Sequence, residues 1–367
     1  GVARLYTDHV FATPDGRARF APVAYVPVAE KVDARFPFRL TTGRLRDHWH
    51  GMSRTGTVAS LYAHAPEPAM EMHPSDAARR GFADGDLVRV ESRRGAVIVP
   101  LVISGDVRPG RAYLPMHWGS ATLAGRDSAG VNAVTAKAFC PASKQPELKH
   151  AAVRVAKAEL PWKLVAFGFP TDANAVVAMR DEARDIASAF DYASIVLIGR
   201  ERAGLLLRMA SPAVPGLACI DAIDRLFGLH GADVACYDDA RRAIGRRMRV
   251  VAGRLAAVRL SGDLNGEAWL REWLTAERDV TQVGALLIAP SASAPGGVAM
   301  RGRVVCNCFD VGETEITTRL AAYQGPPECV VAWLQATLAC GTGCGSCLPE
   351  LQRLSIQRRE LSGTAAA

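Results

Sequence analysis

Residues 36–58, FPFRLTTGRLRDHWHGMSRTGTV, are the stretch that decides the fold. Their apolar start predicts a buried strand, which breaks at Thr41, Thr42, Gly43 and Arg44. A strand ending in Thr-Gly-Arg is typical of an anion site, because a hydroxyl, backbone N–H groups and a guanidinium can converge on one phosphate. The stretch therefore predicts a strand whose end binds phosphate.

Outward from this strand, the sequence predicts a short helix and a hairpin. Residues 73–81, HPSDAARRG, have Pro74 at the helix start and Gly81 at its C-cap. Residues 84–104 predict a hairpin that turns at Arg93-Arg94-Gly95. Strands with one short helix indicate a β-barrel, and residues 151–160, AAVRVAKAEL, predict a helix after it.

The middle of the chain predicts an α+β region without a nucleotide site of its own. Residues 194–209 and 246–263 each predict a hairpin, and residues 267–274 predict a helix that buries Trp269 and Trp273. No glycine-rich phosphate loop occurs in this part of the sequence.

Near the end of the chain, CNC at 306–308 and GTGCGSC at 341–347 supply four cysteines on two short loops. Four thiolates suit a small iron–sulfur cluster, and the glycines let backbone N–H groups face the sulfurs. The same donors suit a structural zinc ion, and unligated core cysteines are the third possibility. Residues 310–322 and 326–338 predict two helices between the loops.

Composition bounds the class of protein. The 367 residues suffice for two or three domains, and 49% hydrophobic with 22% charged residues is typical of a soluble globular protein. No apolar run reaches the roughly 18 residues of a membrane span, so we expect no membrane partner. Nine cysteines, clustered and odd in number, argue against a disulfide framework and for a reducing compartment.

The net charge of +7 does not predict a nucleic-acid site, because the basic residues are scattered and lack an aromatic platform. An acidic electron-donor protein is the more natural partner for such a surface. Residues 291–297, SASAPGG, predict a flexible linker, and residues 361–367 predict a disordered tail.

Five motifs in residues 36–158 resemble the molybdopterin-dinucleotide-binding domain, a double-psi β-barrel of nitrate reductases and formate dehydrogenases. They are LTTGRLRDHWHGMSRTG, APEPAMEMHPSDAARRGFADGDLVRVESRRG, RPGRAYLPMHWG, VNAVT and PASKQPELKH. Without the resemblance, the two histidines near Trp49 could be surface residues, Asn132 a turn residue and Lys144 a solvated cation. The resemblance implies eleven cofactor-binding residues: Thr42, Gly43, Arg44, His48, Trp49, His50, His117, Trp118, Asn132, Lys144 and Gln145.

Residues 304–355 resemble the bacterioferritin-associated-ferredoxin-like [2Fe–2S] module. The matching stretches are CNCFDVGETEI and GTGCGSCLPEL. This resemblance implies that the cluster ligands are Cys306, Cys308, Cys344 and Cys347. Cys329 and Cys340 lie outside the pattern, and we expect both to be packing residues.

Taken together, the chain resembles the C-terminal portion of a cytoplasmic assimilatory nitrate reductase catalytic subunit, of the molybdopterin oxidoreductase family. The implied fold class is mainly β plus α+β. The expected parts are a tail of the preceding catalytic domain at 1–35, the barrel at 36–158, an α+β connecting domain at 159–289, a linker at 290–303, the [2Fe–2S] module at 304–355 and a tail at 356–367.

The resemblance implies an enzyme that reduces nitrate to nitrite, with Mo-bis(molybdopterin guanine dinucleotide) and a [2Fe–2S] cluster as cofactors. It implies a flavoprotein or ferredoxin as electron donor. A [4Fe–4S] cluster is expected only in an N-terminal catalytic half, without which we expect no turnover; no residue of this chain is predicted to be catalytic. A formate dehydrogenase-like molybdoenzyme and a non-catalytic iron–sulfur electron-transfer protein are the alternatives.

Overall fold

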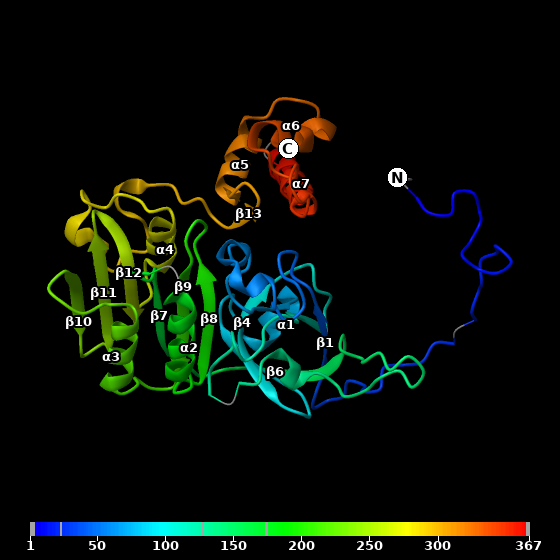
Figure 1. The fold of residues 1–367 in the computed structure, drawn as a ribbon, viewed down its shortest axis with the longest axis horizontal. Coiled ribbons are helices and arrows are strands. Elements are labelled where there is room, and N and C mark those ends of the chain that lie inside the picture. Colours follow the sequence, from blue (N-terminus) through cyan, green and yellow to red (C-terminus); the bar gives the residue numbers. More distant parts are fainter. Residues whose placement is uncertain (1–3, 23, 127, 173–174, 365–367) are drawn as a thin grey trace.

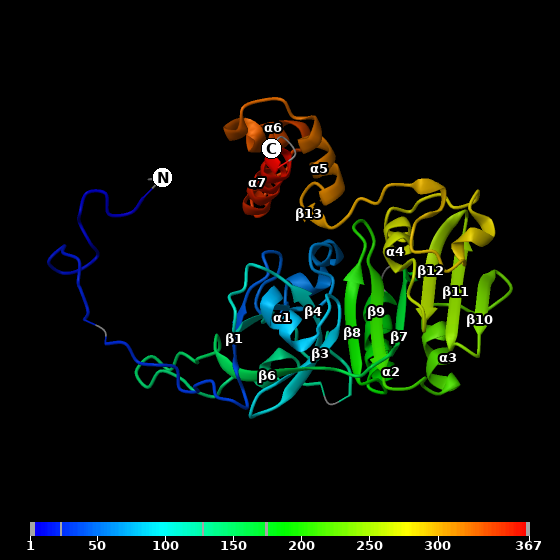
Figure 2. The same ribbon diagram turned by 180° about the vertical axis from the view of Figure 1, so that it is seen from behind.

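A computed structural model describes residues 4–22, 24–126, 128–172 and 175–364. A closed β-barrel lies beside an antiparallel sheet, and a small helical region lies over both (Figure 1). The beginning of the chain runs as an extended arm away from the rest, which both views show (Figure 2), whereas Glu30 and Asp33 contact arginines of the hairpin turn at residues 93–95. The structure is therefore a mixed α/β arrangement.

Six strands close the barrel in the order β1-β5-β2-β4-β3-β6. Leu40, Met70 and Leu101 are among its fully buried side chains. The predicted closed barrel is confirmed, as is the hairpin, since β3 and β4 pair antiparallel. The strands are β1 (Phe38–Gly43), β2 (Met70–Met72), β3 (Leu87–Glu91), β4 (Ala96–Ile103), β5 (Arg111–Pro115) and β6 (Ala151–Lys157).

The helix predicted after β2 is α1, Pro74–Arg80. The His73 side chain accepts a hydrogen bond from the backbone N–H of Ser75, which satisfies one free donor of the first turn. Gly81 ends the helix at a φ of 66°, in the left-handed region that glycine adopts without a Cβ penalty. Both ends are thus set by local sequence, and the prediction is confirmed.

The helix predicted at residues 151–160 is wrong, because β6 occupies this segment. β6 pairs antiparallel with both β1 and β3 and so closes the barrel. Val153 lies opposite Phe38, and Val155 lies opposite Val90. The β-branched valines favour a strand, and pairing with two partners outweighs the helical preference of the alanines.

The second sheet has the order β10-β11-β12-β7-β9-β8, with antiparallel neighbours. Both predicted hairpins are confirmed, as β8–β9 and β11–β12. The predicted helix is also confirmed as α4, which buries Trp269 and Trp273. The elements are β7 (Trp162–Gly168), α2 (Ala175–Ala187), β8 (Tyr192–Ile198), β9 (Gly204–Ser211), α3 (Leu217–Leu226), β10 (Val234–Asp239), β11 (Ile244–Val251), β12 (Arg254–Ser261) and α4 (Glu267–Thr275).

A polar contact joins this sheet to the barrel side of the chain. The Tyr192 hydroxyl donates to the carboxylate of Glu67 at 2.5 Å. Arg208 lies 3.5 Å from Glu67 and 2.6 Å from Glu267 on α4. One guanidinium therefore connects the segment before β2, the strand β9 and the helix α4.

The helical region begins with the short strands β13 (Val304–Cys306) and β14 (Val311–Gly312). The two predicted helices are confirmed as α5 (Glu313–Ala322) and α6 (Val330–Leu338), the latter preceded by η6 (Pro327–Cys329). The last helix, α7 (Leu348–Thr364), corrects the predicted disordered tail for residues 361–364; residues 365–367 lie outside the described residues. The helices pack around Leu334 and Leu351, which are fully buried.

Residues 291–297, expected as a linker, contact α4. The backbone carbonyl of Ser291 accepts a hydrogen bond from Trp269 Nε1 at 3.0 Å, and Ala294 is buried. Short 3₁₀ turns complete the chain: η1 (Thr55–Thr57), η2 (Ala59–Tyr62), η3 (Val131–Val134), η4 (Gly284–Leu287) and η5 (Pro295–Gly297). Among the described residues, no helix combines the length and apolar character needed to cross a bilayer.

Candidate cofactor site and thiol cluster

The end of β1 is tightly packed rather than open. The Thr42 hydroxyl donates to the carbonyl of Leu148 at 2.7 Å, and the Thr41 hydroxyl donates to the carbonyl of Ala112 at 3.1 Å. Both hydroxyls thus donate to backbone carbonyls of neighbouring segments, and phosphate binding at this strand end stays a prediction. A Cβ on Gly43 would lie only 2.8 Å from the Tyr113 ring, so the close approach requires glycine.

Behind the strand end, the structure brings together a buried aromatic group. The His48 ring centroid lies 5.7 Å from His117, 5.8 Å from Trp118 and 4.8 Å from Tyr62. Two ring nitrogens in this group, His48 Nε2 and Trp118 Nε1, are buried with no hydrogen-bond partner among the described residues. The indole N–H of Trp118 can only donate, so a ligand with acceptor atoms would satisfy this buried group.

Hydrogen bonds fix the ring of His117. Its Nε2 accepts from the backbone N–H of Leu45 at 2.8 Å, and its Nδ1–H donates to the carbonyl of His50. Burial lowers the pKa of His117, although the bond to His50 acts in the opposite direction. Burial and the neighbouring His117 lower the pKa of His48 to about 4. Both imidazoles are therefore neutral near pH 7.

Three predicted residues form the rim above this group. The Arg44 guanidinium lies over the Trp49 ring, 5.1 Å from its centroid, and 3.4 Å from His50 Nε2. Trp49 is half exposed, and His50 has a φ of 43°. The rim thus offers one cation and one aromatic face to a ligand.

The remaining predicted cofactor residues lie on two loops. Asn132 is exposed in η3, directly after Val131, whose N–H donates to the carbonyl of Trp118 at 2.9 Å. Lys144 and Gln145 are exposed in the loop that precedes β6, and the Lys144 ammonium lies over Phe139. The bond from Val131 to Trp118 places Asn132 next to the buried group, whereas Lys144 contacts Phe139 in its own loop.

Five cysteine thiols gather in the helical region, and we call Cys306, Cys308, Cys340, Cys344 and Cys347 the thiol cluster. The thiol of Cys306 is close enough to affect the pKa of Cys340 and Cys347, and the thiol of Cys344 is close enough to affect that of Cys308. Cys340, predicted to be a packing residue, is fully buried but also shares this contact. Cys329, predicted to be the other packing residue, is exposed, which corrects that expectation.

The thiol cluster has two chemically different sides. Burial raises the pKa of Cys340 to about 12, and burial together with Cys306 raises that of Cys347 to about 11. On the exposed side, the Ser346 hydroxyl lies 3.1 Å from Cys344 Sγ and lowers the pKa of Cys344. Between the two cysteines of the CNC motif, both side-chain polar atoms of Asn307 are buried without a partner in the described chain.

These features fit a bound group, but the side chains are not arranged as a closed metal site. No set of three or more His, Cys, Asp or Glu side chains in the described residues has the geometry to hold a metal ion. The clustered thiols are nonetheless the donor type that a thiolate-bound iron–sulfur group requires. The fit therefore rests on donor chemistry.

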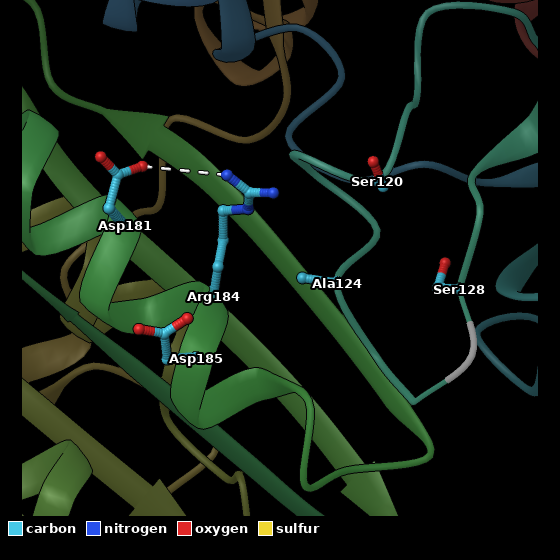
Figure 3. A pocket seen from close by; sticks show the side chains of 6 residues that line it. All are labelled: Ser120, Ala124, Ser128, Asp181, Arg184 and Asp185. Atoms are coloured by element: carbon cyan, nitrogen blue, oxygen red, sulfur yellow. Dashed lines mark ion pairs between the residues drawn. The ribbon is translucent and has the colours of Figure 1, made fainter.

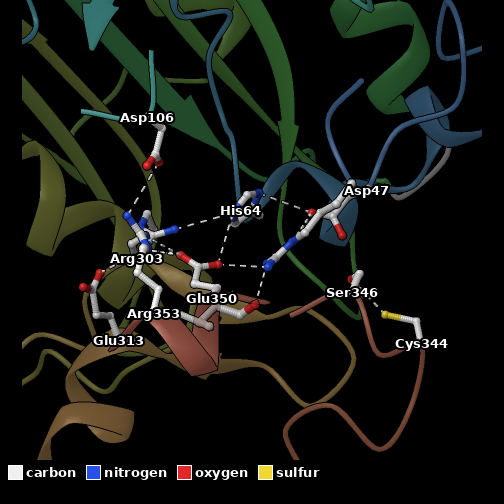
Figure 4. A network of polar contacts seen from close by, with 11 residues as sticks. Asp47, His64, Asp106, Arg303, Glu313, Cys344, Ser346, Glu350 and Arg353 are labelled. Atoms are coloured by element: carbon white, nitrogen blue, oxygen red, sulfur yellow. Dashed lines mark hydrogen bonds and ion pairs between the residues drawn. The ribbon is translucent and has the colours of Figure 1, made fainter. Parts of the chain in front are cut away.

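Sequence reasoning missed the polar network that joins the barrel to the helical region (Figure 4). Arg46, in the loop after β1, donates to Glu350 on α7 at 3.0 Å and to the carbonyl of Val305. Burial opposes the charge of Glu350, but hydrogen bonds from His64 and Arg303 bring its pKa down to about 2. The only signal in the sequence was the charge of these residues, which does not name their partners.

A separate cavity of about 350 Å³ lies between α2 and the loop around residue 124 (Figure 3). Its lining includes Asp181 and Arg184, which lie 3.9 Å apart, together with Asp185, Ser120 and Ser128. None of the predicted cofactor residues or cysteines lines it.

Comparison with known proteins identifies the barrel. Residues 38–152 match the Molydopterin dinucleotide binding domain. The barrel therefore resembles the domains that this family model describes, and the buried group around His48 lies within the matched residues.

Two curated relatives extend the likeness beyond this domain. A nitrate reductase of Klebsiella oxytoca is 33% identical over 346 residues, which cover 93% of this chain and 36% of that protein. A nitrate reductase of Synechocystis sp. is 44% identical over 152 residues, covering 41% of this chain and 21% of the relative. The chain thus spans from about a fifth to about a third of the length of these relatives.

Among solved structures, acetylene hydratase from Pelobacter acetylenicus matches 34% of this chain and 18% of its own, at 19% identity. Its TM-score of 0.28 is too low to support a functional comparison.

Proposed function

We propose that this chain is part of a molybdenum-dependent nitrate reductase that converts nitrate to nitrite. In this proposal the barrel binds the molybdopterin guanine dinucleotide, and the thiol cluster holds a [2Fe–2S] cluster. The 33% identity to a nitrate reductase along 93% of this chain supports the proposal. So do the unpartnered ring nitrogens of the barrel domain.

One observation carries this reading: residues 44–50 contact both proposed cofactor sites. Arg44, His48 and His50 belong to the barrel site, whereas Arg46 donates to the carbonyl of Val305, next to Cys306. Asp47 raises the pKa of Cys344, against the larger effect of Ser346. The thiol cluster and the buried histidines therefore contact the same short segment. Electron transfer between two redox groups requires that they lie close together in this way.

When bound, the molybdenum group supplies oxygen-atom transfer and the iron–sulfur group supplies single electrons. The protein residues have a simpler task. Trp118 and His48 offer buried nitrogens that orient the dinucleotide, and Arg44 offsets its negative charge. Lys144 and Gln145 would join them only if their loop moves toward the barrel.

Cys306, Cys308, Cys344 and Cys347 hold the iron in this proposal, and the buried Cys340 packs against Cys306. We propose that the electron donor is an acidic flavoprotein or ferredoxin, because the chain carries a net charge of +7. The proposed compartment is the cytoplasm, where thiols stay reduced.

Metal analysis of the purified full-length protein tests the proposal. We expect two irons and two acid-labile sulfides for the thiol cluster, and molybdenum with guanine nucleotide for the barrel. Cys308→Ser should lose the iron, whereas Cys329→Ser, at an equally exposed cysteine of the same region outside the thiol cluster, should keep it. One zinc ion in place of the iron would contradict the [2Fe–2S] assignment. Catalytic turnover in the absence of nitrate would contradict the assignment of nitrate as the substrate.

A further inference from the structure

The main chain around the CNC motif is bound by arginines from two other parts of the protein. Arg46, from the loop after β1, donates to the carbonyl of Val305. Arg200, in the turn between β8 and β9, donates to the carbonyls of Asn307 at 3.0 Å and Cys308 at 2.8 Å. Three of the four carbonyls in residues 305–308 therefore accept a hydrogen bond from a guanidinium.

Each arginine is itself anchored by a carboxylate. Arg46 lies 3.2 Å from Asp47 and 3.0 Å from Glu350, with a side chain only 16% exposed. Arg200 lies 3.7 Å from Asp310. A planar guanidinium with several N–H donors can bind carbonyls and a carboxylate at once, which a lysine ammonium does with far less geometric control.

The two arginines approach from different domains. Arg46 comes from the barrel and Arg200 from the second sheet, and these are already joined through Glu67 and Tyr192. The CNC motif is thus held against a surface that the two domains form together. Its position relative to residues 44–50 depends on both contacts.

We propose that Arg46 and Arg200 are positioning residues that clamp residues 305–308, fix the thiol cluster against the barrel and raise the reduction potential of the cluster bound there. The proposal rests on the [2Fe–2S] assignment above. Reduction adds negative charge to the cluster, so two adjacent cations stabilise the reduced form.

The test uses the full-length holoenzyme with Arg46→Gln and Arg200→Gln, each beside its lysine variant. Arg202→Gln is the matched control, because Arg202 lies in the same turn but contacts Phe169 and Glu277 instead. Two measurements are made: the reduction potential by EPR-monitored titration, and hydrogen exchange of backbone amides at residues 304–309.

We expect each glutamine variant to keep its iron, to exchange faster at residues 304–309 and to shift the redox equilibrium several-fold toward the oxidised form. A tenfold shift corresponds to about 59 mV for one electron. The lysine variants should keep most of the potential but not the exchange protection, since charge is retained and geometry is lost. Arg202→Gln should match the wild type in both measurements.

Iron-containing glutamine variants with unchanged potential and exchange would overturn the clamp. If a glutamine variant loses its iron, the lysine variant at the same position is used instead. Amide exchange at residues 304–309 as slow as in the wild type would then contradict the proposal. Absence of iron from the wild-type protein would refute the [2Fe–2S] assignment and the proposed effect on the reduction potential. Amide exchange at residues 304–309 would still test whether Arg46 and Arg200 hold this segment.

Discussion

The Nε2 atom of His117 accepts a hydrogen bond from the backbone N–H of Leu45 at 2.8 Å. On the other side of the ring, Nδ1–H donates to the carbonyl of His50. The imidazole therefore bridges both ends of the loop that carries Arg46 and His48. A single buried ring holds the segment that the two proposed cofactor sites share.

Replacing this ring should destabilise the barrel. We expect His117→Ala to lower the free energy of unfolding by about 2–4 kcal/mol, because it leaves a buried N–H without an acceptor and opens a cavity. Urea denaturation measures the change. His230→Ala, at a histidine whose side chain is 42% exposed, is the control and should change stability by less than about 0.5 kcal/mol. Equal losses in the two variants would contradict the bridging role.

Predictions from the sequence succeeded where local chemistry decides the outcome. Gly81 ends α1 because its left-handed backbone is a property of that residue and its neighbours. The β11–β12 turn likewise lies at Ala252 and Gly253, both with positive φ. Helix 151–160 failed because the state of Val153 is decided by Phe38, more than a hundred residues earlier in the chain.

The same limit applied to the candidate site. The CNC and CGSC motifs are visible as patterns, but the contact of Cys340 with Cys306 depends on how α6 ends, at Ala339 in the left-handed region. Arg200 gave no signal, because its partners are backbone carbonyls of a distant segment. Long-range polar contacts of this kind have no spacing rule that a sequence could reveal.

The contact between Glu350 and the barrel makes docking of the helical region sensitive to substitution. Glu350 is mostly buried and accepts hydrogen bonds from Arg46 and contacts His64, so Glu350→Gln removes the charge that both face. We expect a loss of about 1–3 kcal/mol and faster cleavage by protease at residues 291–303. Glu328→Gln, on an exposed position of the same region, is the control. Cleavage rates that stay at the wild-type value in Glu350→Gln would show that this carboxylate does not hold the region in place.

Acid should weaken the same contact. The folded-state pKa of Glu350 is about 2, below its usual 4.5, so its contribution is complete above pH 4.5 and is lost as the pH falls toward 2. Wild-type protein should therefore become protease-sensitive at residues 291–303 in that window. In Glu350→Gln, sensitivity should already be present at pH 7 and vary less with pH.

Arg208 connects the barrel side of the chain to the second sheet. Its guanidinium lies between Glu67, at 3.5 Å, and Glu267, at 2.6 Å, with the Tyr192 hydroxyl on Glu67. Removing one partner of a buried ion pair costs about 3–5 kcal/mol, because the other charge stays buried. We expect that loss for Arg208→Gln in guanidinium chloride denaturation. Arg184→Gln, which breaks a 3.9 Å pair on the surface of α2, should cost less than about 1 kcal/mol. Similar losses for the two variants would mean that Arg208 adds no more than a surface pair.

Burial of neutral His48 predicts a second acid transition, at higher pH than that of Glu350. The folded-state pKa of His48 is about 4, below the ordinary 6.5, so the unfolded chain binds the proton more tightly. Its contribution is then complete above pH 6.5 and disappears progressively as the pH falls toward 4. One pKa unit corresponds to about 1.4 kcal/mol, so His48 accounts for on the order of 3 kcal/mol at most.

Unfolding free energies measured from pH 7 to pH 4 test this expectation directly. Wild-type stability should fall across that range, whereas His48→Gln should start lower and show a flatter profile, since glutamine does not titrate. His230→Gln keeps His48 and should retain the wild-type slope. A His48→Gln profile as steep as the wild type would assign the acid loss to other groups, and it would remove the reason to treat the imidazole beside Trp118 as a neutral ligand-facing group at pH 7.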